Sequence, residues 1–375
     1  MSGARTPLAE PDRVPGPAPD VTVVVVAYDA ADRVGACLDA LRGQELGGLT
    51  MRVVVVDNAS HDGTADVVAR GYPEVHLVRS PVNTGFAGGN NLGLRTAGGP
   101  WVVLLNDDAI PEPGFVARLV GAISDAAHDV AAVNATVLLA ARFRPARPGD
   151  SEGLLVHGPH GDYVADPAGE VRLVNTTGNV VRTDGYGVDR GWLEEHGRHA
   201  PDREVFGFCG AAVVLRRSAL DVVGLFDDDF FMYYEDTDLS WRLRLAGFRV
   251  EHCPDAVVHH EHGASSRESS ELFRFHDARN RLLVLVKDAT PGLAARCLAR
   301  FVLTTASIAV RRSQPAAHVR TRLRVLASCV RLAPRLLARR RAIGRSAAVS
   351  RADVERLLVR PSAEGPGTYR RVPSD

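Results

Sequence analysis

Cysteines are few in this sequence, and no two of them lie close together. The five are odd in number and scattered: Cys37, Cys209, Cys253, Cys297 and Cys329. This spacing provides neither a disulfide framework nor the paired ligands of a zinc site, and it is typical of a reducing compartment. We therefore expect a cytoplasmic protein.

Long hydrophobic runs and a signal-peptide pattern are also missing. The longest apolar run, Phe301–Val310, is bounded by Arg300 and Arg311, and it is shorter than the roughly 18 to 20 residues that a membrane-spanning helix needs. Residues 1–20 are polar and contain five prolines, so we expect a disordered leader there.

Acidic residues are absent from one long stretch, although the net charge of the chain is zero. Between Ala289 and Ser350 there is no Asp or Glu, whereas thirteen arginines occur. Apolar residues recur there with helical spacing. The pattern predicts a basic amphipathic helical region over residues 289–352, followed by a flexible tail over 353–375.

The basic region favours a polyanionic partner. An anionic membrane surface fits this pattern, because basic amphipathic helices bind such surfaces. Nucleic acid is the competing polyanion, but no aromatic residue that could stack on bases lies between Phe301 and Tyr369. We therefore expect no nucleic-acid partner. A pair of solvated, arginine-rich helices is the alternative.

The first part of the chain alternates buried strands with helices. Val21–Ala27 and Met51–Val56 are runs of β-branched residues, as in strands covered on both faces of a parallel sheet. Further strands are expected at Val75–Arg79, Trp101–Leu105, Val130–Leu139 and Phe206–Leu215, and two short ones at 249–252 and 256–259. The spacing predicts an α/β fold with an open, mostly parallel central sheet flanked by helices, within a domain at residues 21–288. Residues 140–204 interrupt it as a Gly- and Pro-rich insertion.

Polar residues follow the ends of these strands, where ligands of such sheets bind. Asp57 follows the second strand and suits a ribose hydroxyl or a base N–H, with a strand-end cap as the alternative. Asn83–Asn91 is expected to be a Gly- and Asn-rich loop leading into a helix. It lacks both G-x-G-x-x-G and the P-loop lysine. Its glycines permit close backbone approach, and Asn83 and Asn90 can bond a ribose or base.

Asp107 and Asp108 follow the fourth strand. Paired carboxylates at a strand end suit Mg²⁺ or Mn²⁺ that shares its coordination with diphosphate oxygens. A polar turn before Pro111 is the alternative. Three histidines lie between His259 and His262, and one of them could complete the metal site or hold a phosphate, unless the group is a structural turn.

Six carboxylates lie between Asp227 and Asp238, interleaved with four aromatic residues. Acids held among apolar rings are partly desolvated, which raises their pKa and suits a general base. A helix N-terminus rich in acids is the alternative. The pattern that follows, up to Phe248, predicts a basic amphipathic helix.

Several motifs together resemble the family 2 glycosyltransferases, and in particular bacterial rhamnosyltransferase-like members. The matching segments run from about Val21 to Lys287 and read VVVVAYDA, VVVVDNASHDGT, NTGFAGGNNLG, LLNDDA, FGFCGAAVVLRRSALDVVGLFDDDFFMYYEDTDLSWRLRLAGF, VVHHEHGASS and RNRLL. The resemblance implies an A-type glycosyltransferase (GT-A) fold, an inverting mechanism, a nucleotide-diphosphate sugar donor and a divalent metal.

The resemblance also implies roles for individual residues. Asp236 matches the catalytic base, with Glu235 beside it. Asp108 matches the last acid of the metal motif, and His260 matches the histidine of H-x-x-G-x-S, with His259 and His262 as competing candidates. The expected donor-binding residues are Ala27, Asp57, Asn83, Gly85, Phe86, Asn90 and Asp107.

We therefore expect a metal-dependent inverting transferase at the inner face of the cell membrane. Its donor would be dTDP-rhamnose as the first candidate, and its acceptor a hydroxyl of a cell-envelope glycan or a lipid-linked molecule, bound on the side of the 140–204 insertion. The alternatives are a sugar nucleotidyltransferase and an inactive scaffold that binds a nucleotide sugar or lipid. Against the nucleotidyltransferase, no Gly-rich triphosphate-binding loop with Arg or Lys occurs near the first strand.

Overall fold

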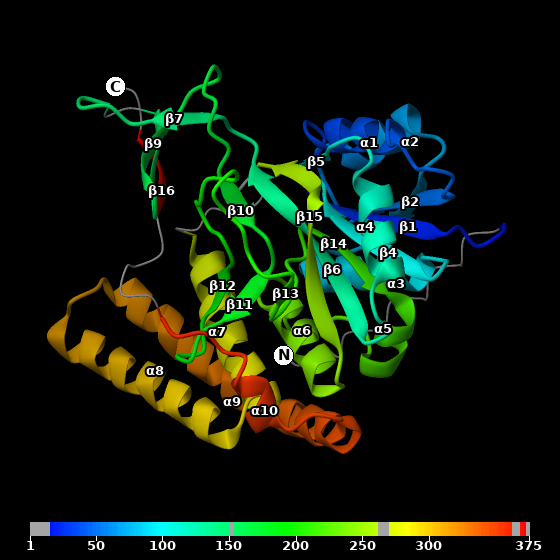
Figure 1. The fold of residues 1–375 in the computed structure, drawn as a ribbon. Helices are drawn as coiled ribbons and strands as arrows, with labels where there is room; N and C mark the ends of the chain where they lie inside the picture. The colour runs from blue at the N-terminus through cyan, green and yellow to red at the C-terminus, as the bar shows by residue number, and fades with distance from the viewer. Residues whose placement is uncertain (1–15, 151–152, 262–269, 362–367, 373–375) are drawn as a thin grey trace.

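The computed structural model describes residues 16–150, 153–261, 270–361 and 368–372 (Figure 1). Most of the expected leader, and His262 of the histidine group, lie outside the described residues. Within the described residues the central element is a ten-stranded sheet, in which eight strands follow the order β13-β15-β6-β14-β4-β1-β2-β3 while β10 and β5 pair at its side.

The sheet is mostly parallel, as the sequence predicts. The four strands at one end run parallel: β3 (His76–Arg79), β2 (Met51–Asp57), β1 (Val21–Ala27) and β4 (Trp101–Asn106). The next strand, β14 (Ala212–Arg216), is antiparallel to both of its neighbours. The remaining strands are β6 (Val130–Leu139), β15 (Arg249–His260), β13 (Glu204–Val205), β5 (Ala109–Pro111) and β10 (Val174–Thr176).

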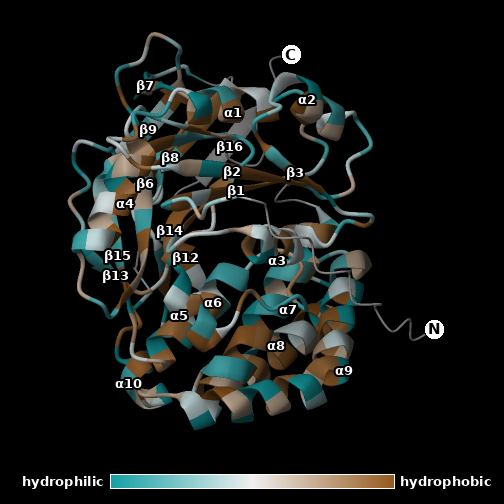
Figure 2. Cartoon of the chain, turned by 90° about the vertical axis from the view of Figure 1, so that its right-hand side faces the viewer, coloured by the Kyte–Doolittle hydropathy of each residue, from teal (hydrophilic) through white to brown (hydrophobic). Residues whose placement is uncertain are grey.

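Helices cover both faces of the sheet, which explains why its strands are apolar throughout. On β1, Val23 and Val25 face one core and Val24 faces the other, and all three are fully buried. The first core includes α1 (Val34–Arg42), α2 (Thr64–Gly71) and α4 (Phe115–Asp125). The second includes α3 (Gly85–Thr96), α5 (Arg217–Val223) and α6 (Glu235–Leu245). Figure 2 shows α1 and α2 on the opposite side of the sheet from α3 and α6.

The expectation of a loop over residues 83–91 is wrong for most of that segment, because helix α3 already begins at Gly85. The glycines serve close packing between helix and strand. A Cβ on Gly89 would lie 2.6 Å from Val26, and one on Gly93 would lie 2.3 Å from Val24. The helix therefore rests directly on β1, and its N-terminus lies at the carboxyl end of the sheet.

Two strand predictions also need correction. The expected strand at Phe206–Leu215 is reduced to β14, which begins only at Ala212. The two short strands expected at 249–252 and 256–259 form the single strand β15. Its pairing with β6 shifts register between Cys253 and Val257, where a bulge accommodates Pro254.

The 140–204 insertion contributes short strands and no helix within its described residues. Three of its strands form a small sheet with β16 (Thr368–Val372): β7 (Phe143–Pro145), β8 (Gly153–Gly158) and β9 (Gly161–Ala165). A separate hairpin joins β11 (Asn179–Val181) and β12 (Gly187–Asp189). Because β16 lies in the stretch expected to be a flexible tail, that stretch is partly ordered.

The C-terminal helices share a core with the α/β domain (Figure 1). They are α7 (Glu271–Asp288), α8 (Pro291–Arg311), α9 (Ala316–Ser346) and α10 (Arg351–Glu355). Trp241 of α6 belongs to the same buried cluster as Leu293 of α8, Leu336 of α9 and Val354 of α10. The basic helical region is therefore packed into the domain, and helix α10 extends from it into the expected tail.

The arginines of this region do not all form one solvated face, contrary to the predicted pattern. Arg339 forms ion pairs of 2.6 Å with Asp227 and Asp229, and Arg340 donates to backbone carbonyls at the end of α7. Arg322 donates to Thr305 of α8. Helix packing leaves carbonyls and carboxylates beside α9, and these arginines satisfy them.

Helix α8 corrects a further expectation. It spans 21 residues, and a stretch of 18 residues within it, 22% of which is buried, is apolar enough to cross a membrane by length and composition alone. Arg296 and Arg300 interrupt the apolar residues, which is why the uninterrupted run looked too short. Such a helix is weak evidence for a membrane span.

Candidate active site

The carboxyl ends of β1 and β2 hold a polar cluster around Asn58. Asp57 is buried and accepts a hydrogen bond from the backbone N–H of Ser60 at 3.2 Å. The side chain of Asn58 accepts from the N–H and hydroxyl of Thr84 and donates to Asn83 and to the carbonyl of Gly85. Asn58 therefore fixes the turn before α3. Asp57 lies beside this turn, and Ala27, which ends β1, accepts from the N–H of Asn58.

The start of α3 contacts the acidic stretch. Gly85 has a positive φ of 71°, and a Cβ there would lie 2.2 Å from the carbonyl oxygen of Phe231. The same carbonyl accepts from the N–H of Ala87. Phe86 packs edge-on against Phe226, with ring centroids 6.2 Å apart. The expected donor side is thus in direct contact with the acidic stretch that contains the expected base. Asn90 is buried and donates to the carbonyl of Phe86.

Asp108 and His260 meet beside the end of β4. Oδ1 of Asp108 lies 3.1 Å from Nε2 of His260, and Nδ1 of the same imidazole is 2.7 Å from Oδ1 of Asn175. His259, the neighbouring residue on β15, points to the other face and contacts Glu112 at 3.0 Å. Strand alternation therefore separates the two histidines, and His260 is the one that joins the site.

Asp107 has a different environment from Asp108. Burial raises its pKa to about 6, although Arg33 opposes the shift with a contact of 3.3 Å to Oδ2. Arg33 thus supplies a positive charge at the edge of this site.

The Asp108–His260 pair fits a divalent cation that shares its coordination with a ligand. Oδ1 of Asp108 is buried and has no hydrogen bond of good geometry within the described residues. Asn175 orients the imidazole, as outer partners of metal-bound histidines do. Within the same residues no group of three or more His, Cys, Asp or Glu side chains is arranged around a common centre. The protein alone thus offers two ligands, and oxygens of a bound diphosphate could supply others.

The stretch before α6 has a strained backbone. Phe231, Tyr233 and Tyr234 all have φ between 66° and 68°, a region that costs a non-glycine residue about 1–2 kcal/mol. Asn280 of α7 is fully buried and donates to the carbonyls of Phe230, Met232 and Tyr233 at 2.7 to 2.9 Å. Strain that persists under such constraints is typical of functional sites.

Glu235 and Asp236 follow the strained stretch and begin α6. Asp236 accepts from the N–H groups of Gly210 and Thr237, and its pKa is raised because burial outweighs these hydrogen bonds. Burial raises the pKa of Glu235 further, with repulsion from Asp236 and Asp238 adding to it. Oε2 of Glu235 has no hydrogen-bond partner in the described part of the chain. Glu235 therefore holds its proton more tightly, whereas Asp236 is more readily available in the carboxylate form that a general base needs.

The predicted amphipathic character of α6 is wrong, because the helix is buried nearly all round. Its arginines point inward: Arg242 donates to Asp238 at 2.9 Å, and Arg244 donates to backbone carbonyls near β13. Lys287, at the end of α7, is also buried and forms ion pairs with Asp227 at 2.8 Å and with Asp238. Burial raises the pKa of Asp238, but Lys287 and Arg242 outweigh it and lower the pKa overall. Several acids of the stretch are therefore structural.

Asp189 is a residue that sequence reasoning missed. It ends β12 in the insertion and lies close enough to both Asp236 and His260 to interact with them electrostatically. Burial raises its pKa to about 6, against a hydrogen bond from Thr176. The sequence around it, GVDRG, carries no signal that could have identified it.

Comparisons with known proteins agree with this arrangement. Residues 22–159 match the family model described as Glycosyl transferase family 2, and residues 169–281 match that described as Glycosyl transferase family group 2. N-acetylglucosaminyl-diphospho-decaprenol L-rhamnosyltransferase of Mycobacterium tuberculosis is 28% identical over 245 residues, which cover 60% of this chain and 71% of the relative.

Two further likenesses are more partial. Succinoglycan biosynthesis protein ExoO of Rhizobium meliloti is 36% identical over 121 residues, which are 32% of this chain and 34% of that protein. The chain thus spans about a third of the length of this relative. The crystal structure of GalNAc-T7 with UDP, GalNAc and Mn²⁺ matches with a TM-score of 0.52 and 13% identity, over 72% of this chain and 48% of that one. That likeness concerns the fold alone.

Proposed function

Because the chain belongs to the family 2 glycosyltransferases and has their A-type fold, we propose that it transfers a sugar with inversion from a nucleotide-diphosphate donor to an acceptor hydroxyl. Asp236 would be the base. The observation that carries this proposal is the contact of 3.1 Å between Asp108 and His260 beside the end of β4, and Asp189, which interacts electrostatically with both His260 and Asp236, supports it.

The chemistry assigned to Asp236 follows from its surroundings. A hydroxyl becomes a competent nucleophile when a carboxylate removes its proton as the new bond forms. Burial raises the pKa of Asp236, which strengthens it as a base, while its hydrogen bonds from backbone N–H groups keep the carboxylate oriented. Inversion needs one such base, in contrast to the two carboxylates of glycoside hydrolases.

The donor would lie against the ends of β1, β2 and β4. Asp57, with the turn that Asn58 fixes, would receive the base and ribose, while Arg33 adds positive charge beside Asp107. A divalent cation held by Asp108 and His260 would offset the charge that develops on the departing diphosphate. Dependence on such a metal is part of the proposal.

The finer assignments follow from the relatives and the surface. The rhamnosyltransferase from M. tuberculosis acts, by its name, on a sugar attached to a diphospho-lipid, so we assign L-rhamnose as the first donor sugar to test and a lipid-linked acceptor. The exposed apolar residues Leu298, Val302 and Leu303 on α8, together with exposed arginines on α9, support contact with the inner face of an anionic membrane.

Thermal stability of the purified chain with nucleoside diphosphates and their sugars, with and without Mn²⁺, tests the proposal. A ligand that binds only the folded state raises the melting temperature. We expect a metal-dependent rise with one nucleotide that Asp108→Asn loses and Asp236→Asn keeps, whereas sugar transfer fails in both. A folded sample that responds to no nucleotide sugar would instead indicate a scaffold without transferase activity.

A further inference from the structure

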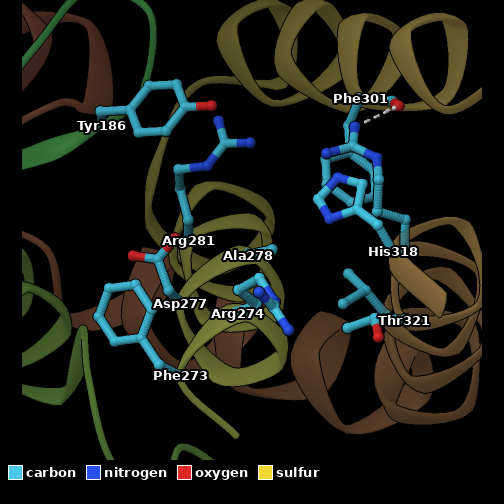
Figure 3. A pocket seen from close by; sticks show the side chains of 11 residues that line it. Tyr186, Phe273, Arg274, Asp277, Ala278, Arg281, Phe301, His318 and Thr321 are labelled. Atoms are coloured by element: carbon cyan, nitrogen blue, oxygen red, sulfur yellow. Dashed lines mark hydrogen bonds between the residues drawn. The ribbon is translucent and has the colours of Figure 1, made fainter. Parts of the chain in front are cut away.

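A cavity of about 150 Å³ lies between α7, α8, α9 and the β11–β12 hairpin (Figure 3). Its lining is cationic and aromatic. The residues that line it are Tyr186, Phe273, Arg274, Asp277, Ala278, Arg281, Phe301, His318, Thr321, Arg322 and Val325. Three arginines thus surround a space that contains one carboxyl group.

Arg281 is the central observation. It is 5% exposed, and its guanidinium lies 4.0 Å from the centre of the Tyr186 ring (Figure 3). Its Nε is buried, and no hydrogen-bond partner for it exists among the described residues. A buried N–H donor without a partner is costly, so a ligand that accepts hydrogen bonds would be favoured beside it.

The other charged groups of the cavity differ in how far they are already satisfied. Arg322 is fixed, because it donates to Thr305 at 2.8 Å and to the carbonyl of Phe301 at 3.1 Å. Arg274 is exposed and can adjust its position. Asp277 forms no ion pair with Arg281 in the described structure, although Arg281 partly opposes the rise in its pKa that burial causes. The cavity therefore keeps a net positive charge that the chain does not neutralise.

The cavity adjoins the start of α6. Tyr234, which precedes Glu235, accepts a hydrogen bond from the N–H of Gly187 beside Tyr186, and it interacts with Asp277 and Arg281. Tyr233 packs edge-on against Phe273 with ring centroids 5.0 Å apart. Residues that line the cavity thus contact the strained stretch that positions the proposed base.

We propose that this cavity binds a phosphate group and that the phosphate belongs to the acceptor. This deepens the proposed function and rests on it. A cavity of this volume holds a group about the size of benzene, so a phosphate fits, whereas whole nucleotides need sites of about 300 Å³ or more. Guanidinium groups bind phosphate through paired hydrogen bonds, and α8, which lines the cavity through Phe301, exposes an apolar side on which a lipid chain could lie.

Calorimetric titration of the full chain with inorganic pyrophosphate, farnesyl diphosphate and farnesol, in the presence of EDTA, tests this site. EDTA removes divalent cations that could hold diphosphate at Asp108. We expect farnesyl diphosphate to bind more tightly than pyrophosphate, and farnesol to bind least. Arg281→Gln should weaken binding of both diphosphates about 10- to 100-fold, as loss of a charged hydrogen-bonding group predicts.

Two further variants keep the test decisive if Arg281→Gln folds poorly. Arg274→Gln alters an exposed residue of the lining and should weaken diphosphate binding about 3- to 10-fold. This loss is smaller than the loss expected for one well-aligned hydrogen bond to a charged group, because the exposed side chain is also solvated. Arg341→Gln removes an equal charge from an exposed part of α9 outside the lining and should leave binding unchanged. Equal effects of Arg274→Gln and Arg341→Gln, or no binding of either diphosphate to the unaltered chain, would overturn the phosphate site.

The remaining outcomes test the assignment of the phosphate to a lipid-linked acceptor, and they distinguish failure of the phosphate site from failure of the proposed function. Equal affinity for pyrophosphate and farnesyl diphosphate would overturn the assignment to a lipid-linked acceptor. Nucleotide-sugar binding is measured on the same samples with Mn²⁺. If nucleotide binding fails while Arg281-dependent diphosphate binding persists, the proposed function is refuted and the phosphate site stands. The reverse result refutes the phosphate site alone.

Discussion

Replacement of Asn280 by Ala should disable the site before it unfolds the protein. The Asn280 amide supplies two N–H groups to three buried carbonyls of the strained stretch. Leaving buried acceptors unpaired costs about 1–3 kcal/mol each, so with two N–H groups lost we estimate about 2–6 kcal/mol. The three left-handed residues store strain of about 3–6 kcal/mol, so relaxation of this stretch relieves as much energy as the amide provided.

The expected result is local. Hydrogen exchange of the amides from residue 231 to 236 should accelerate by a factor of about 10 to 100, since local opening becomes easier. The sugar-transfer rate should fall about 10- to 100-fold, because a misplacement of about 1 Å at a catalytic group can cost that much. Donor binding should change less than the transfer rate, because the contacts at Asp57 and Asp108 do not involve Asn280, whereas the start of α3 contacts the acidic stretch through Phe231 and Phe226.

Thr22→Val provides the matched control. Thr22 is fully buried at the opposite end of β1 and donates to the carbonyl of Gly98 at 2.8 Å, so its replacement should cost about 1–3 kcal/mol without touching the site. If Asn280→Ala and Thr22→Val lower the melting temperature similarly and also lower the transfer rate similarly, then the positioning role of Asn280 is refuted.

Further predictions concern the carboxyl groups and the C-terminal helix. Asp236→Asn should lower the transfer rate by a factor of about 10² to 10⁴, whereas Glu235→Gln should change it less than about tenfold. The Glu235→Gln variant should still lose rate at acid pH, and this loss should begin above the usual pKa range of an Asp because burial raises the pKa of Asp236. The pH–rate profiles of both variants test this. Asp189 binds its proton more tightly in the folded state, with a pKa of about 6 against 3.8 in the unfolded state, so the free energy of unfolding should fall as the pH rises from about 4 to 6. Asp189→Asn should remove this pH dependence and stabilise the protein by at most about 3 kcal/mol above pH 6. Denaturant unfolding at several pH values measures both effects. Arg339→Ala removes one of the cations that contact the buried carboxyl of Asp227, so it should lower the free energy of unfolding by about 1–3 kcal/mol. It should also lower the sugar-transfer rate more than the exposed control Arg341→Ala does.

The sequence predicted the central sheet and its flanking helices well, because continuous runs of β-branched residues such as Val21–Ala27 indicate strands that are buried on both faces. It also predicted that Asp57 and Asp108 would share an edge of the sheet, since parallel strands bring their carboxyl ends together. The pairing of Asp108 with His260 was implied by resemblance, and strand alternation in the structure distinguishes His260 from His259. The catalytic and binding roles of these residues stay predictions.

Other features could not be read from local patterns. Asp189 lies in an insertion whose path no periodicity describes. The arginines of α6 and α9 look like residues of solvated faces, because a helical pattern does not reveal which carbonyls and carboxylates a distant segment will place against it. Arg242 and Arg339 are determined by tertiary contacts. The role of Asn280 was likewise hidden, since its three acceptors are 47 to 50 residues away in the chain.

The ion pair between Arg339 and Asp227 has a consequence for the order in which the protein matures. The two residues are 112 positions apart, and domains form from the N-terminus as a chain is synthesised. The sheet can assemble while α9 is still inside the ribosome, but Asp227 and Asp229 gain this partner only after α9 has emerged. A nascent chain would therefore form its sheet first and complete the ion pairs of its acidic stretch only when α9 packs against it.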